Sequence, residues 1–134
     1  MSPRSILICD DEIELARELG EWFELCGWAA RTAGSAAEAR GLLLDGDAPD
    51  VLLSDRRMPG EDGDSLLIFA QGLPDARRPR VTALMSGDAR LDTKPCPVGV
   101  DFVFLKPVDP DQIRDAFLRS LDNTGTRINR FPQG

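Results

Sequence analysis

Apolar and polar residues are grouped along the chain in blocks that predict five strands. Short apolar runs, each followed by a polar residue, lie at 6–9, 51–54, 81–85 and 102–105, and a weaker run lies at 28–32. Continuous apolar runs of this length are typical of strands that are covered on both faces. The pattern therefore predicts the buried strands of a parallel sheet.

Helical patterns lie between these runs. Apolar residues recur at the spacing of one helix face, which predicts helices at 13–26, 35–44, 64–72 and 109–121. Gly27 is suited to end the first helix, because glycine tolerates the conformation that ends helices. Ser35 and Glu38 have the spacing of a capping box, and Pro110 suits the first turn of the last helix.

The segment before the last strand has a weaker pattern. Pro95, Pro97 and Gly99 prevent a long helix there, so we expect one or two turns from about Asp88 and then irregular chain. The alternation of strands and helices predicts an α/β fold. This fold is a doubly wound five-stranded parallel sheet with helices on both faces, and its fourth helix is short or irregular.

Five polar residues directly follow the predicted strands: Asp10, Asp11, Asp55, Ser86 and Lys106. In doubly wound sheets, ligands bind outside the carboxyl ends of the strands, where the strand order reverses. We therefore expect these five side chains to share one rim of the sheet.

The residue types at this rim predict phosphoryl chemistry. Neighbouring carboxylates repel one another by about 4 kcal/mol per pair at ~4 Å and an effective dielectric constant of about 20. A proton or a cation must relieve that repulsion, and Mg²⁺ suits carboxylate oxygens with open positions for water and phosphate. Asp55 is then a candidate nucleophile, Lys106 a cation for the phosphoryl oxygens, and Ser86 a hydroxyl donor to them.

Each candidate also has a structural alternative. The two acidic residues after the first strand suit the N-cap and first turn of the next helix. Asp55 and Ser86 could belong only to turns, and Lys106 could be a surface lysine.

The amino-acid composition argues against several classes of function. The 16 basic and 23 acidic residues give a net charge of -7, which argues against direct binding to nucleic acid. The chain has no histidine, which removes His-based catalysis and His-ligated zinc. Cys9, Cys26 and Cys96 form no CxxC pair, so we expect no structural disulfide, with Cys9 and Cys26 as small core residues.

Length and end patterns set the expected organisation. We expect one domain at residues 1–121, and residues 122–134 as a C-terminal tail or the start of a linker. The chain has no signal-peptide pattern and no apolar run of the ~20 residues that a membrane span needs. We therefore expect a cytoplasmic protein without membrane contact.

Taken together and in this order, these residues resemble the response-regulator receiver domain of two-component signalling. The resemblance covers about residues 4–121. It rests on Asp10-Asp11-Glu12, on Asp55 followed by Met58-Pro59-Gly60 and Gly63, on Ser86-Gly87 and on Lys106-Pro107. It implies the flavodoxin-like form of the doubly wound sheet.

The resemblance also implies roles at the rim. Asp55 would be the phosphoacceptor and would receive its phosphoryl group from a phosphohistidine on a partner. Asp11 and Asp55 would ligate Mg²⁺ directly, Asp10 would do so through water, and the backbone carbonyl of Arg57 would complete the protein ligands.

Further implied features lie near the last two strands. Ser86 would turn inward to bond the phosphoryl group, Lys106 would pair with that group, and the Lys106–Pro107 bond would be cis. The family often has an aromatic residue three positions before the lysine, where this chain has Val103. Phe102 and Phe104 should point to the other face, so we do not expect the usual coupling of the serine to an aromatic ring.

The implied function is a phosphorylation-dependent switch and not an enzyme beyond its own phosphoryl transfer and autodephosphorylation. Its partners would be a histidine kinase or phosphotransfer protein, an output partner and, as a further option, a second copy in a homodimer. One alternative is a degenerate receiver that binds proteins without phosphorylation. Another is a Mg²⁺-dependent phosphatase of the haloacid-dehalogenase type. That class requires an aspartate at the position where this chain has Arg57.

A last hypothesis concerns access of water to the site. Arg57 and Asp88 have opposite charges, and the resemblance implies that they flank the phosphoryl group. They either form a salt bridge that slows hydrolysis or are solvated independently, and exposed ion pairs contribute little.

Overall fold

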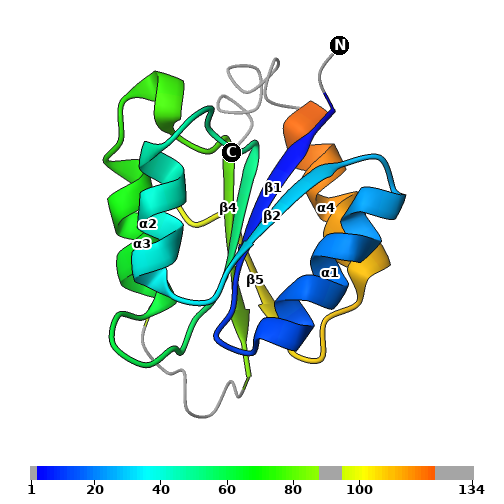
Figure 1. Cartoon of the computed structure of the whole chain (residues 1–134), viewed down its shortest axis with the longest axis horizontal. Coiled ribbons are helices and arrows are strands. Elements are labelled where there is room, and N and C mark those ends of the chain that lie inside the picture. The colour runs from blue at the N-terminus through cyan, green and yellow to red at the C-terminus, as the bar shows by residue number, and fades with distance from the viewer. Residues whose placement is uncertain (1–2, 88–94, 123–134) are drawn as a thin grey trace.

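Five parallel strands form the sheet of the computed structural model, which describes residues 3–87 and 95–122 (Figure 1). The strands are β1 (Ser5–Cys9), β2 (Ala29–Ala33), β3 (Val51–Asp55), β4 (Val81–Ser86) and β5 (Phe102–Leu105). Their order in the sheet is β2-β1-β3-β4-β5, and each neighbouring pair is parallel. The strand order therefore reverses between β1 and β3.

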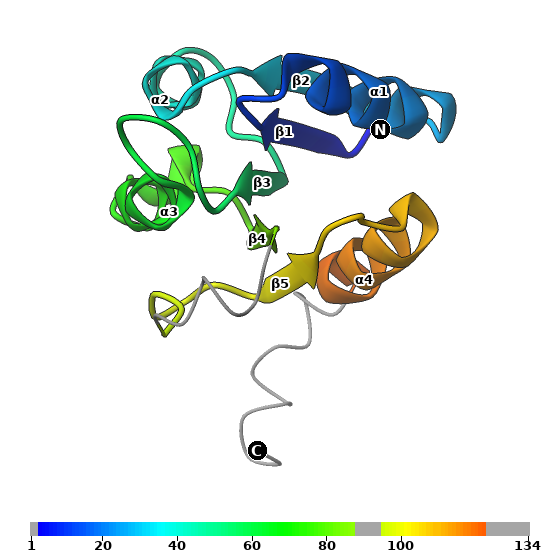
Figure 2. The same cartoon turned by 90° about the horizontal axis from the view of Figure 1, so that it is seen from below.

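Helices cover both faces of the sheet. They are α1 (Ile13–Leu25), α2 (Ala36–Leu44), α3 (Gly63–Gln71) and α4 (Pro110–Asp122), with a short 3₁₀ helix at Asp75–Arg77. Figure 2 shows α1 and α4 on one face and α2 and α3 on the other. The doubly wound sheet predicted from the sequence is confirmed. None of the helices within the described ranges is long and apolar enough to cross a membrane.

The core consists of two apolar layers, one on each face. Alternate residues of β1 supply both: Ile8 packs in the layer under α1 and α4, and Leu7 packs in the layer under α2 and α3. Phe23 of α1 and Phe117 of α4 are fully buried in the first layer. Each such side chain contributes about 1.5–3 kcal/mol on burial, which fixes the helices and hence the strand ends.

Local signals begin and end these elements largely as expected. Gly27 has φ +92° after α1, in the left-handed region that favours glycine. The Ser35 hydroxyl accepts a hydrogen bond from the Glu38 backbone N–H at 3.1 Å, which caps α2. The Glu38 carboxylate accepts from the Gly34 N–H at 2.7 Å, one residue earlier than in a standard capping box.

The strand β5 differs from the expectation of a strand buried on both faces. It lies at the edge of the sheet, and Val103 and Leu105 are exposed. Phe102 and Phe104 point to the opposite face and pack against Phe117, as the alternation predicts. The expected short helix falls mostly on residues 88–94, which lie outside the described residues, and residues 95–101 contain no helix.

Two further features were not predicted correctly. Cys26 is exposed instead of lying in the core, because it caps the end of α1 beyond the last buried position, and it lies 3.6 Å from Arg114 Nη1. The 3₁₀ helix before β4 has no apolar periodicity that would reveal it. Cys9 is buried as expected.

Candidate functional site

The predicted rim residues all lie at the carboxyl ends of strands. Asp10 and Asp11 follow β1, Asp55 ends β3, Ser86 ends β4 and Lys106 follows β5. The first three therefore lie at the point where the strand order reverses, and this is where doubly wound sheets bind ligands.

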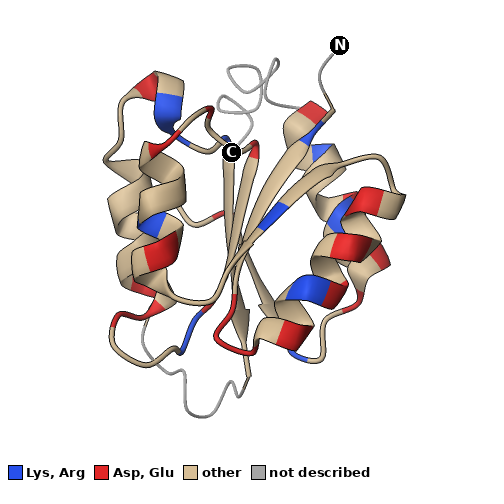
Figure 3. Cartoon of the chain, viewed as in Figure 1, with Lys and Arg blue, Asp and Glu red and all other residues tan. Residues whose placement is uncertain are grey.

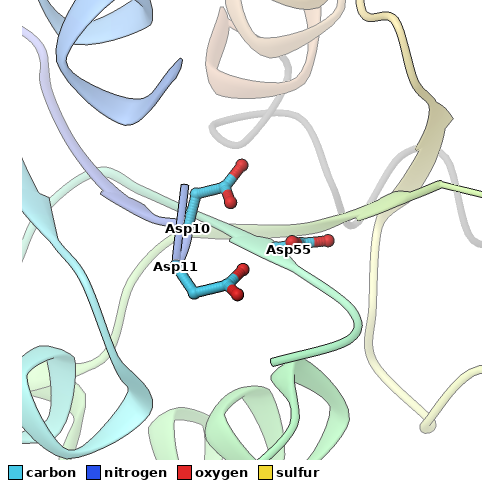
Figure 4. Close-up of side chains that lie close together, drawn as sticks. All are labelled: Asp10, Asp11 and Asp55. Carbon is cyan, nitrogen blue, oxygen red and sulfur yellow. The ribbon is translucent and has the colours of Figure 1, made fainter. Parts of the chain in front are cut away.

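Three carboxylates form a cluster at this point. Asp10, Asp11 and Asp55 each offer an oxygen, and these oxygens lie within 4.8 Å of one another (Figure 4). Asp10 and Asp55 are buried, whereas Asp11 is exposed and leaves one side of the cluster open. A set of hard oxygen donors with an open side fits Mg²⁺, which retains several waters and accepts phosphate oxygens.

Asp10 uses its two oxygens differently. Its Oδ1 accepts a hydrogen bond from the Glu12 backbone N–H at 3.0 Å, which orients the side chain in the turn before α1. Its Oδ2 faces Lys106 at 2.9 Å. Glu12 occupies the N-cap position of α1 and caps no N–H with its side chain. The role of Asp10 as a helix cap therefore does not account for its placement.

The Lys106 ammonium contacts carboxylates at the rim. Its Nζ lies 2.9 Å from Asp10 Oδ2, 3.3 Å from Asp55 Oδ2 and 3.6 Å from Glu12 Oε1. Burial alone would lower its pKa, but the hydrogen bond and charge of Asp10, with those of Asp55, raise it above the ordinary lysine value. The ammonium therefore remains charged at the rim.

Asp55 has a pKa raised to about 6. Burial is the largest cause, because it penalises the carboxylate, and the negative charge of Asp10 adds to it, while Lys106 opposes both. Burial also raises the pKa of the neighbouring Cys9 thiol to about 12, so this thiol stays neutral and is no rival nucleophile.

The remaining predicted residues surround this cluster. Ser86 is buried, and its backbone carbonyl accepts from the Lys106 N–H at 2.8 Å, which joins the ends of β4 and β5. The Lys106–Pro107 bond is cis, as expected. The Arg57 side chain is exposed, and the carbonyl ligand assigned to this residue stays a prediction. The proposed ion pair of Arg57 involves Asp88, which lies outside the described residues.

A buried ion pair next to the cluster was missed by the sequence reasoning. Arg56 and Asp64 pair through two hydrogen bonds, at 2.9 and 3.0 Å. The signal that could have found them is a pair of opposite charges, one directly after the Asp55 strand and one in the first turn of α3. From the sequence alone, a single charged residue in a loop or at the start of a helix is expected to be exposed to solvent.

Further acidic residues lie beside the three-carboxylate cluster. Figure 3 shows acidic residues on the loop that follows β1 and along α1, beside the cluster. Lys106 is the cation that the structure pairs with both Asp10 and Asp55. In the described part of the chain, the rim therefore combines three clustered carboxylates with the Lys106 ammonium.

Comparisons with known proteins agree with this architecture. The family model of the response regulator receiver domain matches residues 6–118. The chain is 29% identical over 123 residues to sporulation initiation phosphotransferase F of Bacillus subtilis, covering 90% of this chain and 96% of that protein. It is 32% identical over 122 residues to a transcriptional regulator of Haloferax volcanii, which covers 90% of this chain but only 20% of that protein.

Solved structures give the same result. A receiver domain from Methanospirillum hungatei JF-1 has a TM-score of 0.82 at 23% identity, covering 94% of this chain and 99% of that one. The signal receiver domain of a histidine kinase from Syntrophus aciditrophicus has a TM-score of 0.77 at 27% identity, covering 90% of this chain and 92% of that one. With a family match over most of its length, the chain belongs to the response regulator receiver domain family.

Proposed function

We propose that this receiver domain is a phosphorylation-dependent signalling switch with Asp55 as its phosphoacceptor. The observation that carries the proposal is the shared placement of three carboxylates and one ammonium, with Lys106 Nζ 3.3 Å from Asp55 Oδ2. Transfer of a phosphoryl group to a carboxylate needs a nucleophile, a metal-binding set of oxygens and a cation for the phosphoryl oxygens. This rim offers all three.

Each residue at the rim has its own role in the proposed phosphoryl transfer. Asp11, Asp55 and the Arg57 carbonyl would hold Mg²⁺ directly, and Asp10 would hold it through water. The ion would supply the positive charge that neutralises the phosphoryl oxygens. An oxygen of Asp55 attacks phosphorus in line with the leaving group. The new O–P bond forms as the P–N bond of a phosphohistidine breaks, and the donor imidazole keeps the electron pair of that bond.

Two further residues hold the product of this transfer. Lys106 already contacts Asp55, so its ammonium is placed to pair with an oxygen of the phosphoryl group on that residue. Ser86 ends the neighbouring strand β4, and its hydroxyl is the proposed donor to a second phosphoryl oxygen.

An apolar cleft beside the phosphoacceptor suits a protein as phosphodonor. A cavity of about 680 Å³ lies between α1 and the turn from Lys106 to Pro110. Apolar side chains of α1, including Leu15, Leu19 and Trp22, line it together with Lys106. We propose that a histidine kinase or phosphotransfer protein docks here by an apolar surface that presents its phosphohistidine to Asp55.

The output would be a changed affinity for a partner. The phosphoryl group adds negative charge beside Lys106 and Ser86, which lie at the ends of β5 and β4. Movement of the loops after these strands can alter binding only if the partner contacts the two states differently. In this proposal residues 1–121 form the switch, and residues 122–134 are a tail or the start of a linker.

The test is incubation of the full chain with acetyl phosphate and Mg²⁺, followed by intact-mass spectrometry. The expected result is a stable gain of one phosphoryl group that disappears in Asp55→Asn. The matched control is Asp47→Asn, which removes one charge from an exposed residue and should still gain the group.

Each other outcome contradicts the proposal in its own way. Release of phosphate without an accumulating phosphoprotein indicates a phosphatase. No reaction at all indicates a module that binds proteins without phosphorylation. A gain that persists in Asp55→Asn places the phosphoacceptor elsewhere.

A further inference from the structure

The ion pair between Arg56 and Asp64 is unusual because it is buried. The two side chains are only 6% and 10% exposed. Desolvation of two charges opposes such a pair, and an apolar pair of similar volume is often as stable or more stable. Its presence directly after Asp55 therefore calls for a role other than stability.

Arg56 joins three segments at the site. Its Nη2 donates to the Pro95 carbonyl at 3.2 Å, in the connection between β4 and β5. Its backbone N–H donates to the Met85 carbonyl of β4 at 2.8 Å, and its own carbonyl accepts from the Gly63 N–H of α3 at 2.9 Å. Both its main chain and its side chain are thus held by neighbouring elements.

The backbone around Arg56 packs closely against the first turn of α3. A Cβ atom on Gly63 would lie 2.2 Å from the Asp55 carbonyl oxygen, so the first turn of α3 packs directly on the phosphoacceptor backbone. Asp64 is the next residue of that turn. The ion pair therefore adds a directional side-chain link where the backbone of α3 already packs closely on the segment from Asp55 to Arg57.

We propose that Arg56 is a positioning residue for the metal and phosphoacceptor site. Through Asp64 and the Pro95 carbonyl it holds residues 55–57 in place, so that the Asp55 carboxylate and the Arg57 carbonyl can bind one Mg²⁺ together. The inference rests on the roles proposed above for Asp55 and Arg57. Arg56 itself touches neither the ion nor the phosphoryl group in this proposal.

The chemistry of the guanidinium explains why an apolar contact would not serve equally well. Apolar packing is non-directional, whereas a planar guanidinium paired with both oxygens of a carboxylate fixes orientation as well as distance. Arg56 also has donors left over for the Pro95 carbonyl. Lysine offers a point charge and cannot reproduce this fork.

The test separates positioning from stability with the double variant Arg56→Met/Asp64→Leu. It removes both charges and leaves no buried charge unpaired, so the fold should remain as stable as the wild type. We expect its Mg²⁺ dissociation constant, measured by calorimetry on the unphosphorylated full chain, to rise about tenfold. The Mg²⁺ concentration for half-maximal phosphorylation by acetyl phosphate should rise by the same factor.

Two matched variants sharpen the result. Asp75→Leu/Arg78→Met removes an exposed ion pair of equal charge between the first residue of the 3₁₀ helix and the residue that follows it, and should leave Mg²⁺ affinity unchanged. Arg56→Lys keeps the charge but loses the fork, and it should also weaken Mg²⁺ binding. If the double variant does not fold, Arg56→Lys tests the positioning role instead.

The outcomes distinguish this inference from the proposed function. Wild-type Mg²⁺ affinity in a stable double variant, or in Arg56→Lys where the double variant does not fold, overturns the positioning role and leaves Asp55 as phosphoacceptor. Weakened binding in a chain that is never phosphorylated supports positioning and rejects the switch. A wild-type chain that binds no Mg²⁺ overturns both.

Discussion

The Asp55 carboxyl group has a pKa raised to about 6, well above that of an ordinary aspartate. Because burial and the charge of Asp10 raise this pKa, the folded state holds a proton that the unfolded state has already lost between about pH 4 and about pH 6. The contribution of Asp55 to stability therefore falls as the pH rises through this window. Above about pH 6 Asp55 is charged in the folded state, and its buried carboxylate destabilises the fold by an amount that no longer changes with pH.

A neutral side chain at this position removes that penalty. In Mg²⁺-free buffer at neutral pH we expect Asp55→Asn to unfold with a free energy about 1–3 kcal/mol higher than wild type, since one pKa unit is worth about 1.4 kcal/mol. Urea denaturation across the window should show a flatter dependence on pH in the variant. Asp47→Asn, at an exposed position, should match wild type, and equal stability of Asp55→Asn would show that burial does not dominate at Asp55.

Lys106 contacts two of the carboxylates proposed to bind the metal ion, so it would compete with that ion for their oxygens. Its Nζ contacts Asp10 and Asp55, two of the three clustered carboxylates. We expect Lys106→Met to strengthen Mg²⁺ binding severalfold, measured by calorimetry, because the ammonium no longer neutralises the cluster. Phosphorylation by acetyl phosphate at saturating Mg²⁺ should slow, since the phosphoryl oxygens lose a cation. Weaker Mg²⁺ binding in this variant would contradict the competition.

Sequence alone found the residues that follow strands and missed the buried ion pair between the loop after β3 and α3. Asp10, Asp11, Asp55 and Lys106 are brought together because strand ends of a parallel sheet meet at one rim, a property of topology. The pairing of Arg56 with Asp64 depends on how the loop after β3 folds onto α3. No periodicity encodes that loop, so its buried charges were not predicted.

At the scale of elements, the contact between β3 and α3 leaves no room for a side chain at Gly63. A Cβ there would lie 2.2 Å from the Asp55 carbonyl oxygen, so Gly63→Ala must move α3 or the backbone at Asp55. We expect a loss of about 2 kcal/mol or more in unfolding free energy, within the range for overpacking, and slower phosphorylation. Urea denaturation and the acetyl phosphate reaction measure the two effects.

The control for this prediction is a glycine with open space. Gly41 lies within α2, and a Cβ there would meet nothing within 4 Å. Gly41→Ala should therefore stabilise the fold by about 0.5–1 kcal/mol, because alanine is the better helix former. If both variants behaved alike, the close approach at Gly63 would not be what fixes α3.

Helix and strand positions were predictable from periodicity, but exposure was not. The pattern placed β5 at the observed residues, Phe102–Leu105, yet it suggested burial on both faces. Burial depends on which helices cover a strand, and β5 is an edge strand whose Val103 and Leu105 face away from α4. An apolar run shows that a strand forms, whereas its neighbours decide what it contacts.

On the scale of the whole molecule, charge favours the binding of cations at the rim. The chain has 23 acidic and 16 basic residues, and acidic residues lie beside the cluster on α1 (Figure 3). Salt of any kind screens the repulsion between exposed charges, so a stabilising effect of added salt would not by itself indicate a site. A specific site must respond to Mg²⁺ beyond ionic strength.

We therefore expect Mg²⁺ to raise the midpoint of thermal unfolding above that in NaCl of equal ionic strength. A ligand bound only by the folded state stabilises it by about 1.4 kcal/mol at ten times its dissociation constant. Asp11→Asn should abolish the difference, because it removes one of the clustered oxygens at an exposed position where the fold does not need the carboxylate. A persistent Mg²⁺ effect in that variant, or equal midpoints in both salts for wild type, would show that the acidic cluster responds to screening alone.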